Sequence, residues 1–251
     1  MAMATNSFWF SLGIIAWAAM GSAFGQIVYS NDFNQSPGTR YPEWTSSQIE
    51  YASTTNPPGA GTLPAQTITN ADAPSHAQRF LGEFGGPVIG APGDPGYNHT
   101  RVQQTVRLTL NDLPLHRHLR IAFDLYILKS WDGNSPMYGP DRWSFGVGGR
   151  PPLLATTFSN NPKVEKEGCY QDYPRPSSPP RSGAVSTNTF GFRPYFGDSV
   201  YHLEFVFEHS DPQLVLEFAG DLFEGKGVPD ESWGLDNVEV SIQRKAATGG
   251  T

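Results

Sequence analysis

The sequence predicts an all-β fold built from antiparallel strands. Several segments alternate between apolar and polar residues with a period of two, as strands do when one face is buried. Beyond the first 25 residues, no long segment keeps the 3.6-residue period of an amphipathic helix. Glycine and proline number 27 and 22 of the 251 residues, and they are concentrated in the segments between the alternating ones. These three observations favour a single antiparallel sandwich or barrel.

The clearest alternation lies in the middle and last thirds of the chain. In residues 120–128, RIAFDLYIL, the four side chains Ile121, Phe123, Leu125 and Ile127 share one face. Residues 200–209 and 213–220 alternate in the same way, and the short polar segment between them, from His209 to Pro212, predicts a hairpin. Further strands are predicted over residues 27–33, 102–110, 142–149, 152–160 and 230–242.

Residues 1–25 predict a secretory signal peptide. An apolar run from Phe8 to Met20 is followed by small residues and by a plausible cleavage site at Ala23-Phe24-Gly25. The usual basic start is missing, since no Lys or Arg precedes Arg40. An uncleaved anchor is the alternative, but the run is shorter than the roughly 20 residues that span a bilayer. We therefore expect a secreted, periplasmic or cell-surface protein, with one domain over 26–243, a flexible tail over 244–251 and no membrane span after signal removal.

The composition excludes some classes of partner. The chain carries 24 acidic and 17 basic residues, a net charge of −7, and no basic cluster, which argues against a nucleic-acid partner. Cys169 is the single cysteine, so the chain can form no internal disulfide. A domain of this size can bury enough apolar surface without one.

Asp236 is the first candidate metal ligand. In DESWGLDNVEVSI, residues 230–242, strict alternation would place its carboxylate on the same face as Val238 and Val240. An inward carboxylate costs several kcal/mol unless it is paired or bound to a metal. Calcium, an arginine such as Arg142, or backbone amides of a neighbouring strand could each supply the partner. Asp32, in the first strand, could share such a site if the first and last strands lie side by side.

A second candidate region is KSWDGNSPMYGPDRWSFGVGG, residues 129–149. Its turns place Asp132 and Asp141 at one end of a sheet, and the acidic run near Asp230 and Glu231 adds further carboxylates. Calcium takes six to eight oxygen ligands, which carboxylates and loop carbonyls supply. The alternative is that these Asp residues only stabilise turns through their own backbone hydrogen bonds.

Aromatic residues occur beside the same acids. Trp131 and Tyr138 are candidates to stack on a sugar ring, while Trp143 and Trp233 lie next to strands and could simply close the ends of a sandwich.

These segments resemble a known superfamily. The combination of SWDGN, GPDRWSFGVGG, LLATTFSN, GDSVYHLEFVFEH and DESWGLDNVEV is similar to exported bacterial domains of the concanavalin A-like, LamG-type jelly rolls, over about residues 27–243. The resemblance implies two curved antiparallel sheets, a calcium at the rim near Asp236 and the 132–141 loop, and sugar binding or adhesion. It identifies no sugar-binding triad in this chain.

No complete catalytic set is present in the sequence. Glu204 and Glu208 share one strand face, but four residues along a strand span about 13 Å. Retaining glycosidases need two carboxyl groups about 5–5.5 Å apart. The sequence therefore predicts a non-catalytic exported module that binds a polysaccharide or another cell-surface component, with a structural calcium. The alternatives are a glycan-cleaving hydrolase that uses Asp124 with a loop acid, and a purely structural surface protein.

Overall fold

A computed structural model describes residues 25–36, 38–46, 50–53, 61–62, 70–73, 78–86, 88, 100–192, 196–223 and 226–244. The predicted signal peptide, apart from Gly25, and the tail beyond residue 244 lie outside these described residues.

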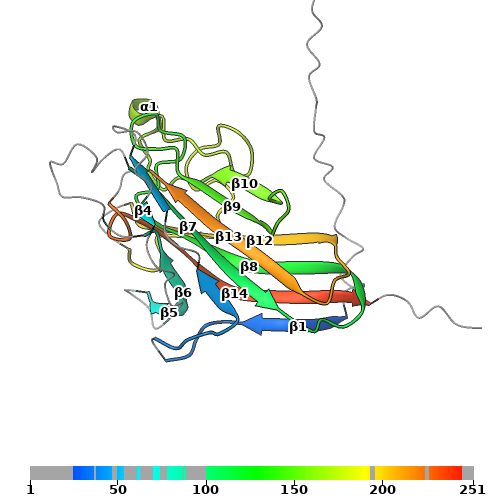
Figure 1. Cartoon of the computed structure of the whole chain (residues 1–251). Helices are drawn as coiled ribbons and strands as arrows, with labels where there is room; N and C mark the ends of the chain where they lie inside the picture. The colour runs from blue at the N-terminus through cyan, green and yellow to red at the C-terminus, as the bar shows by residue number, and fades with distance from the viewer. Residues whose placement is uncertain are drawn as a thin grey trace, which may run out of the picture.

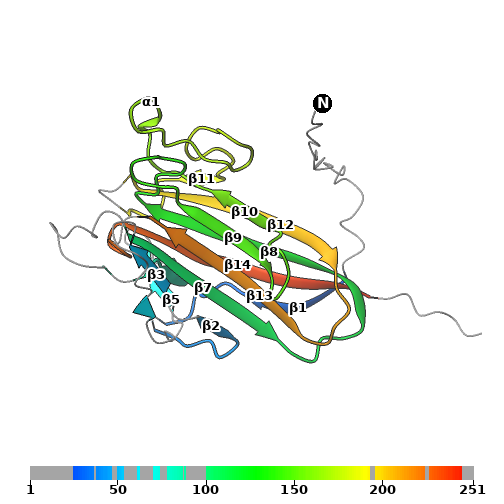
Figure 2. The ribbon, with the colours of Figure 1, turned by 45° about the horizontal axis from the view of Figure 1, so that its top comes forward.

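The described chain forms two antiparallel sheets of seven strands each, packed face to face (Figures 1 and 2). The first sheet has the order β11-β12-β8-β14-β6-β5, with β1 also paired to β14. The second has the order β10-β9-β13-β7-β3-β4, with β2 also paired to β7. This confirms the predicted all-β sandwich.

The strands of the first sheet are β1 (Gln26–Asn31), β5 (Asn70–Asp72), β6 (Arg79–Phe84), β8 (His116–Lys129), β11 (Ser186–Thr187), β12 (Asp198–Glu208) and β14 (Glu231–Arg244). Those of the second are β2 (Trp44–Ser46), β3 (Glu50–Ser53), β4 (Gly61–Thr62), β7 (Thr100–Leu110), β9 (Arg142–Val147), β10 (Leu154–Thr157) and β13 (Leu214–Leu222). Among the described residues the only helix is the four-residue α1 (Val164–Glu167), and none is long enough to cross a membrane.

The core lies between the sheets and consists of the faces that alternation predicted. The side chains of Ile121, Phe123, Leu125 and Ile127 on β8 are fully buried there. Phe218 on β13 packs 5.2 Å from Phe123, centroid to centroid, in an edge-to-face contact. Burial of each such side chain contributes about 1.5–3 kcal/mol to stability. Apolar burial on both sheets therefore holds the sandwich together.

The segment from His209 to Pro212 does not form the predicted hairpin. β12 belongs to the first sheet and β13 to the second, so this short connection crosses between sheets. His209 N donates to Arg117 O and Leu113 N donates to Pro212 O, which attaches the crossing to the turn between β7 and β8. The prediction was wrong because alternation reports which residues are buried, not which strand pairs with which.

The last strand changes face at a β-bulge. β14 pairs with β8 in regular register up to Asp236, opposite Asp124. Glu239 is then opposite Ala122, so two residues of β14 face one residue of β8. Asn237 has a φ of 50°, a left-handed conformation that Asn tolerates better than most residues. As a result Trp233, Leu235, Val238 and Val240 all enter the core, while Asp236 points to the opposite face of the sheet. The prediction that Asp236 shares a face with the valines was therefore wrong.

The first and last strands do lie side by side, as predicted. β1 runs antiparallel to β14, with Asn31 opposite Val238.

Two buried histidines lie where the chain crosses between the sheets. The rings of His116 and His209 stack with centroids 5.1 Å apart, and His116 Nε2 lies 2.8 Å from His209 Nδ1. His116 Nδ1 lies 2.6 Å from the carbonyl oxygen of Pro114, so Nδ1 carries a proton. When both rings are neutral, His116 Nε2 must therefore accept the proton of His209 Nδ1. Two fully protonated rings cannot keep this contact.

We expect this pair to make the fold sensitive to acid. Burial lowers the pKa of His209, and the neighbouring His116 acts in the same direction. A histidine with a lowered folded-state pKa contributes stability above the unfolded-state pKa of about 6.5, and that contribution is lost as the pH falls below it. His209→Gln should therefore reduce the loss of unfolding free energy between pH 7.5 and pH 5, measured by urea denaturation. The control is His202→Gln, at a half-exposed ring; equal pH dependence in wild type and both variants would contradict this account.

Candidate functional site

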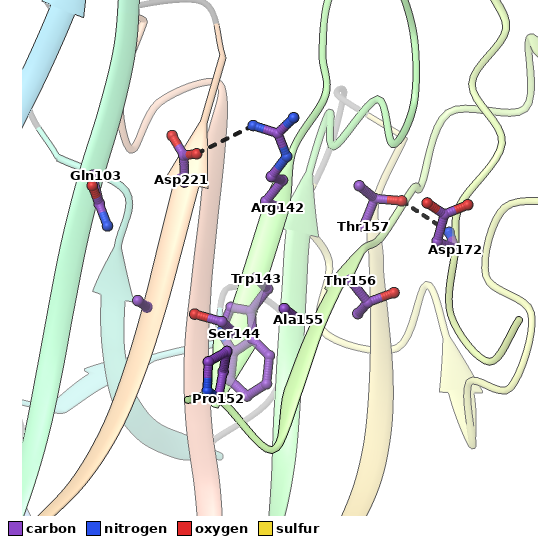
Figure 3. A pocket seen from close by; sticks show the side chains of 11 residues that line it. Gln103, Arg142, Trp143, Ser144, Pro152, Ala155, Thr156, Thr157, Asp172 and Asp221 are labelled. Carbon is purple, nitrogen blue, oxygen red and sulfur yellow. Dashed lines mark hydrogen bonds and ion pairs between the residues drawn. The ribbon is translucent and has the colours of Figure 1, made fainter. Parts of the chain in front are cut away.

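A polar groove lies on the outer face of the second sheet, and Figure 3 shows the side chains that line its larger hollow. Two adjoining hollows of about 380 and 200 Å³ form it, and they share Gln103, Ser144, Pro152 and Ala219. The floor is a row of small side chains that lie side by side on four neighbouring strands: Thr105, Ala219, Ser144 and Ala155. Because these side chains are short, a hollow remains above them.

Longer polar side chains flank this floor on both sides. On one side the row is Gln103, Asp221, Arg142 and Thr157, again one residue from each strand. On the other side Arg107 and Glu217 are cross-strand partners, and Glu217 is opposite Gly146. A Cβ at Gly146 would lie 2.9 Å from Cα of Pro152, so the segment after β9 folds closely over the end of the groove. Hydrogen-bond donors and acceptors therefore flank a low floor, as a polyhydroxylated ligand requires.

The aromatic residues at the groove are buried. Trp143 and Phe145 border it, but their side chains are 1% and 0% exposed because they point into the core. Among the residues described as lining the groove, none presents an exposed aromatic face for ring stacking.

A cluster of buried carboxylates lies at one end of the sandwich. Asp132, Asp141 and Glu231 each place a carboxylate oxygen within 4.8 Å of the other two, and their exposures are 4%, 0% and 2%. Asp132 follows the end of β8, Asp141 precedes β9, and Glu231 begins β14. The cluster therefore joins three segments that are distant in the sequence.

Backbone contacts fix the geometry of this cluster. Asp141 accepts hydrogen bonds from the backbone amides of Asp132, at 2.5 Å, and of Phe223, at 3.0 Å. Gly133 has a φ of 60°, and a Cβ there would collide with the carbonyl oxygen of Tyr170, so only glycine fits this turn.

A proton or a cation within the cluster would offset the repulsion between its carboxylates. Burial raises the pKa of Asp141 well above its usual range, and the neighbouring Asp132 raises it further. Three oxygen-donor carboxylates match the ligands that calcium prefers, and water can complete the coordination. These residues therefore fit a hard divalent cation.

A second group shares Asp132. Glu167 and the thiol of Cys169 also lie within 4.8 Å of it and of each other, and all three residues are buried. Asn161 donates to both Asp132 and Glu167 through its side-chain amide. Asp132 is thus held from two directions.

The groove and the acidic cluster are connected through shared residues. Asp141, in the cluster, is followed directly by Arg142, in the groove. Asn134 in the same loop accepts a 2.8 Å hydrogen bond from Thr157 and donates one of 2.8 Å to Asp172, and both of those residues line the groove. The conformation of the 132–141 loop therefore determines the shape of one end of the groove.

The structure separates the predicted metal ligands into different places. Asp132 and Asp141 come together, and the third member of their cluster is Glu231, which the sequence offered only as part of an acidic run. Asp230 instead accepts a 2.7 Å hydrogen bond from Ser130 and lies 3.4 Å from Lys226 Nζ. Asp32 is exposed and accepts a hydrogen bond from the amide of Asn34.

Asp236 has hydrogen-bond donors rather than a cluster of acids around it. Its carboxylate accepts from Tyr126 OH at 2.8 Å, Gln78 Nε2 at 3.0 Å and the amide of Asn237 at 2.8 Å. Burial raises its pKa to about 6, although these three donors act in the opposite direction. Within the described residues Asp236 is in no group of three potential metal ligands. Neutral donors thus satisfy this buried carboxyl.

The two aromatic candidates differ in their placement. Trp131 is fully buried in the core and donates its Nε1 proton to Ser232 O, so its ring presents no face to a ligand and the stacking prediction is wrong for it. Tyr138 is partly exposed, and its role in binding stays a prediction.

The groove itself was missed in the sequence. Its signal was present in the outward positions of 142–146 and 217–221, where Ser144, Gly146 and Ala219 are unusually small for exposed strand positions. Only the strand order shows that these residues lie next to one another.

Comparison with known proteins adds only distant likenesses. No protein-family model and no curated protein sequence matches the chain. Similar solved structures include dimeric latent PorU of Porphyromonas gingivalis, with 10% identity and a TM-score of 0.38. The similarity covers 84% of this chain but only 14% of that one.

Two further solved structures are also similar to this chain. A cleaved adhesin domain of Lys-gingipain from the same organism has 13% identity and a TM-score of 0.38, over 87% of this chain and 99% of that one. An exo-β-1,3-galactanase of Phanerochaete chrysosporium has 10% identity and a TM-score of 0.26, over 78% and 28%. At these scores the likenesses do not assign a family or a function.

The environment of Cys169 gives a testable expectation. Burial raises the pKa of its thiol to about 12, and the adjacent Asp132 adds to the shift. Because the thiolate is the reactive form, the native protein at pH 8 should react with an aromatic disulfide reagent far more slowly than the protein in 6 M guanidinium. Rapid stoichiometric labelling of the native protein would contradict the buried placement.

Proposed function

We propose that this protein is an exported, non-catalytic binding module for polysaccharide, with a structural calcium. The observation that carries the proposal is the polar groove across β7, β13, β9 and β10, with its row of small floor residues. Figure 3 shows Gln103, Arg142, Thr157 and Asp221 around this hollow. Hydroxyl groups of a sugar both donate and accept hydrogen bonds, and the groove offers partners of both kinds.

We also propose a structural family and a cellular location for this protein. The sandwich architecture agrees with the resemblance to concanavalin A-like, LamG-type domains. The signal peptide predicted over residues 1–25 supports a location outside the cytoplasm. The proposal is non-catalytic because the groove holds no close pair of available carboxyl groups among the described residues. Asp172, Asp221 and Glu217 are the acids that line it. Asp221 and Glu217 are held in ion pairs with arginines, and Asp172 accepts hydrogen bonds from Asn134 and from the amide of Ser177.

The calcium is proposed for the acidic cluster rather than for Asp236. Asp132, Asp141 and Glu231 would hold the ion, and the backbone contacts of Asp141 would keep the loop in place for it. Bound calcium would supply positive charge that offsets the repulsion between the three carboxylates. The expected role is structural, through the loop that borders the groove.

Filling the groove should abolish binding. Ala219 is at the centre of the floor, so Ala219→Tyr would place a ring where the ligand lies. The matched control is Val206→Tyr, at a partly exposed position of β12 on the other sheet. On a glycan array we expect binding by wild type and by the control but not by Ala219→Tyr, with equal melting temperatures. Release of reducing ends by the wild type, or array binding that survives in Ala219→Tyr, would contradict the proposal.

Calcium should stabilise the fold through the cluster. A ligand present at 100 times its dissociation constant adds about 2.7 kcal/mol of stability. We expect wild type to melt at higher temperature in calcium than in chelator, and Glu231→Gln and Asp141→Asn to lose that difference. Asp236→Asn is the control, which should be destabilised yet keep the calcium response. If calcium has no effect on wild type, the carboxylates share protons instead, and stability should rise as the pH falls from 7 toward 5.

A further inference from the structure

The groove is lined by three arginines and three acids, on a chain that is acidic overall. Arg107, Arg142 and Arg150 line its two hollows, whereas the protein has a net charge of −7. The lining is balanced in charge, so a negatively charged ligand would be attracted by those arginines that the acids do not already hold.

The acids of the groove are already occupied by neighbours. Arg101 pairs with Asp221 at 2.8 Å, and Arg107 pairs with Glu217 at 2.7 Å. Asp172 accepts hydrogen bonds from Asn134, at 2.8 Å, and from the amide of Ser177, at 3.2 Å. Arginines therefore compensate the negative charges of Asp221 and Glu217, while neutral donors satisfy Asp172.

Two arginines, by contrast, are only loosely held. Arg142 lies 3.6 Å from Asp221, which Arg101 already holds more closely, and its side chain is 57% exposed. Arg150 lies 3.9 Å from Asp211 and is 52% exposed. Both distances are near the upper limit for an ion pair, and exposed ion pairs contribute little to the stability of the fold. Their guanidinium groups keep N–H donors available for a ligand.

These two arginines line different hollows of the one groove. Arg142 lies in the first hollow and Arg150 in the second, and Gln103, Ser144 and Ala219 belong to both hollows. Arg142 begins the six-residue strand β9 and Arg150 follows its end, so the two are separated along the strand, which rises about 17 Å from Arg142 to Val147. A chain of linked sugar rings that bears more than one negative group could therefore contact both.

The chemistry of the groove favours an anionic group on the ligand. Because Trp143 and Phe145 are buried, the groove offers no stacking surface, and affinity must come from polar contacts. The planar guanidinium fork matches a carboxylate in bidentate geometry. We propose that the groove binds a polysaccharide of uronic acids, with Arg142 and Arg150 each pairing with a carboxylate.

The inference rests on the proposed function, and the test separates the two. Binding is measured by isothermal titration with polygalacturonate, with neutral galactan and with dextran sulfate, in 50 mM and 500 mM salt. We expect polygalacturonate to bind at least about tenfold more tightly than either other polymer, with affinity that falls as salt rises. The double variant Arg142→Gln/Arg150→Gln should lose at least about tenfold of that affinity and most of its salt dependence.

The control variant is Arg117→Gln, at an exposed arginine of β8 on the other sheet, which should bind as wild type does. Galactan binding as tight as polygalacturonate, unaffected by the double variant, would overturn the uronic-acid inference and leave the proposed module intact. Preference for dextran sulfate would also overturn it, in favour of sulfate recognition. No binding to any of the three polymers would contradict both the inference and the proposed function.

Discussion

The removal of three carboxylates from water at one end of the sandwich is the constraint on which the rest of the site depends. Asp132, Asp141 and Glu231 arrive from the end of β8, the start of β9 and the start of β14, so the cluster joins the ends of strands from both sheets. Buried like charges repel strongly unless protons or a cation offset them. The 132–141 loop must therefore be tied down by whatever neutralises the cluster. Because Arg142 follows Asp141 and Asn134 contacts Thr157, the same condition shapes one end of the groove.

The two sheets carry different kinds of outer surface. On the first sheet the bulge at Asn237 turns Asp236 outward, where Tyr126 and Gln78 satisfy it under a small apolar cluster that includes Phe80 and Phe190. On the second sheet one row of outward positions, the floor of the groove, carries small side chains, and the hollow above them is open to solvent. The first outer face is thus partly covered by its own chain, and the second is available to a ligand. This asymmetry explains why the acidic cluster and the groove, but not Asp236, form the candidate site.

Much of the fold could be predicted from the sequence, because burial of one strand face imposes a period of two that is visible without any partner. The faces of β7, β8, β12 and β13 follow in this way, as does the proximity of Asp132 and Asp141 across one short loop. What escaped prediction depends on pairing between distant strands. Nothing local distinguishes a hairpin at His209 from a crossing between sheets, and a single left-handed Asn237 reverses the face of Asp236. The groove likewise exists only because Ala219 and Ser144 are neighbours across two strands.

The most direct test of the account is a crystal structure of the protein grown in calcium, with anomalous scattering recorded for the ion. The account predicts a peak about 2.3–2.6 Å from carboxylate oxygens of Asp132, Asp141 and Glu231, with further oxygen ligands from the loop or from water. A map that shows these three side chains hydrogen-bonded directly to one another, with the ion elsewhere or nowhere, would contradict it.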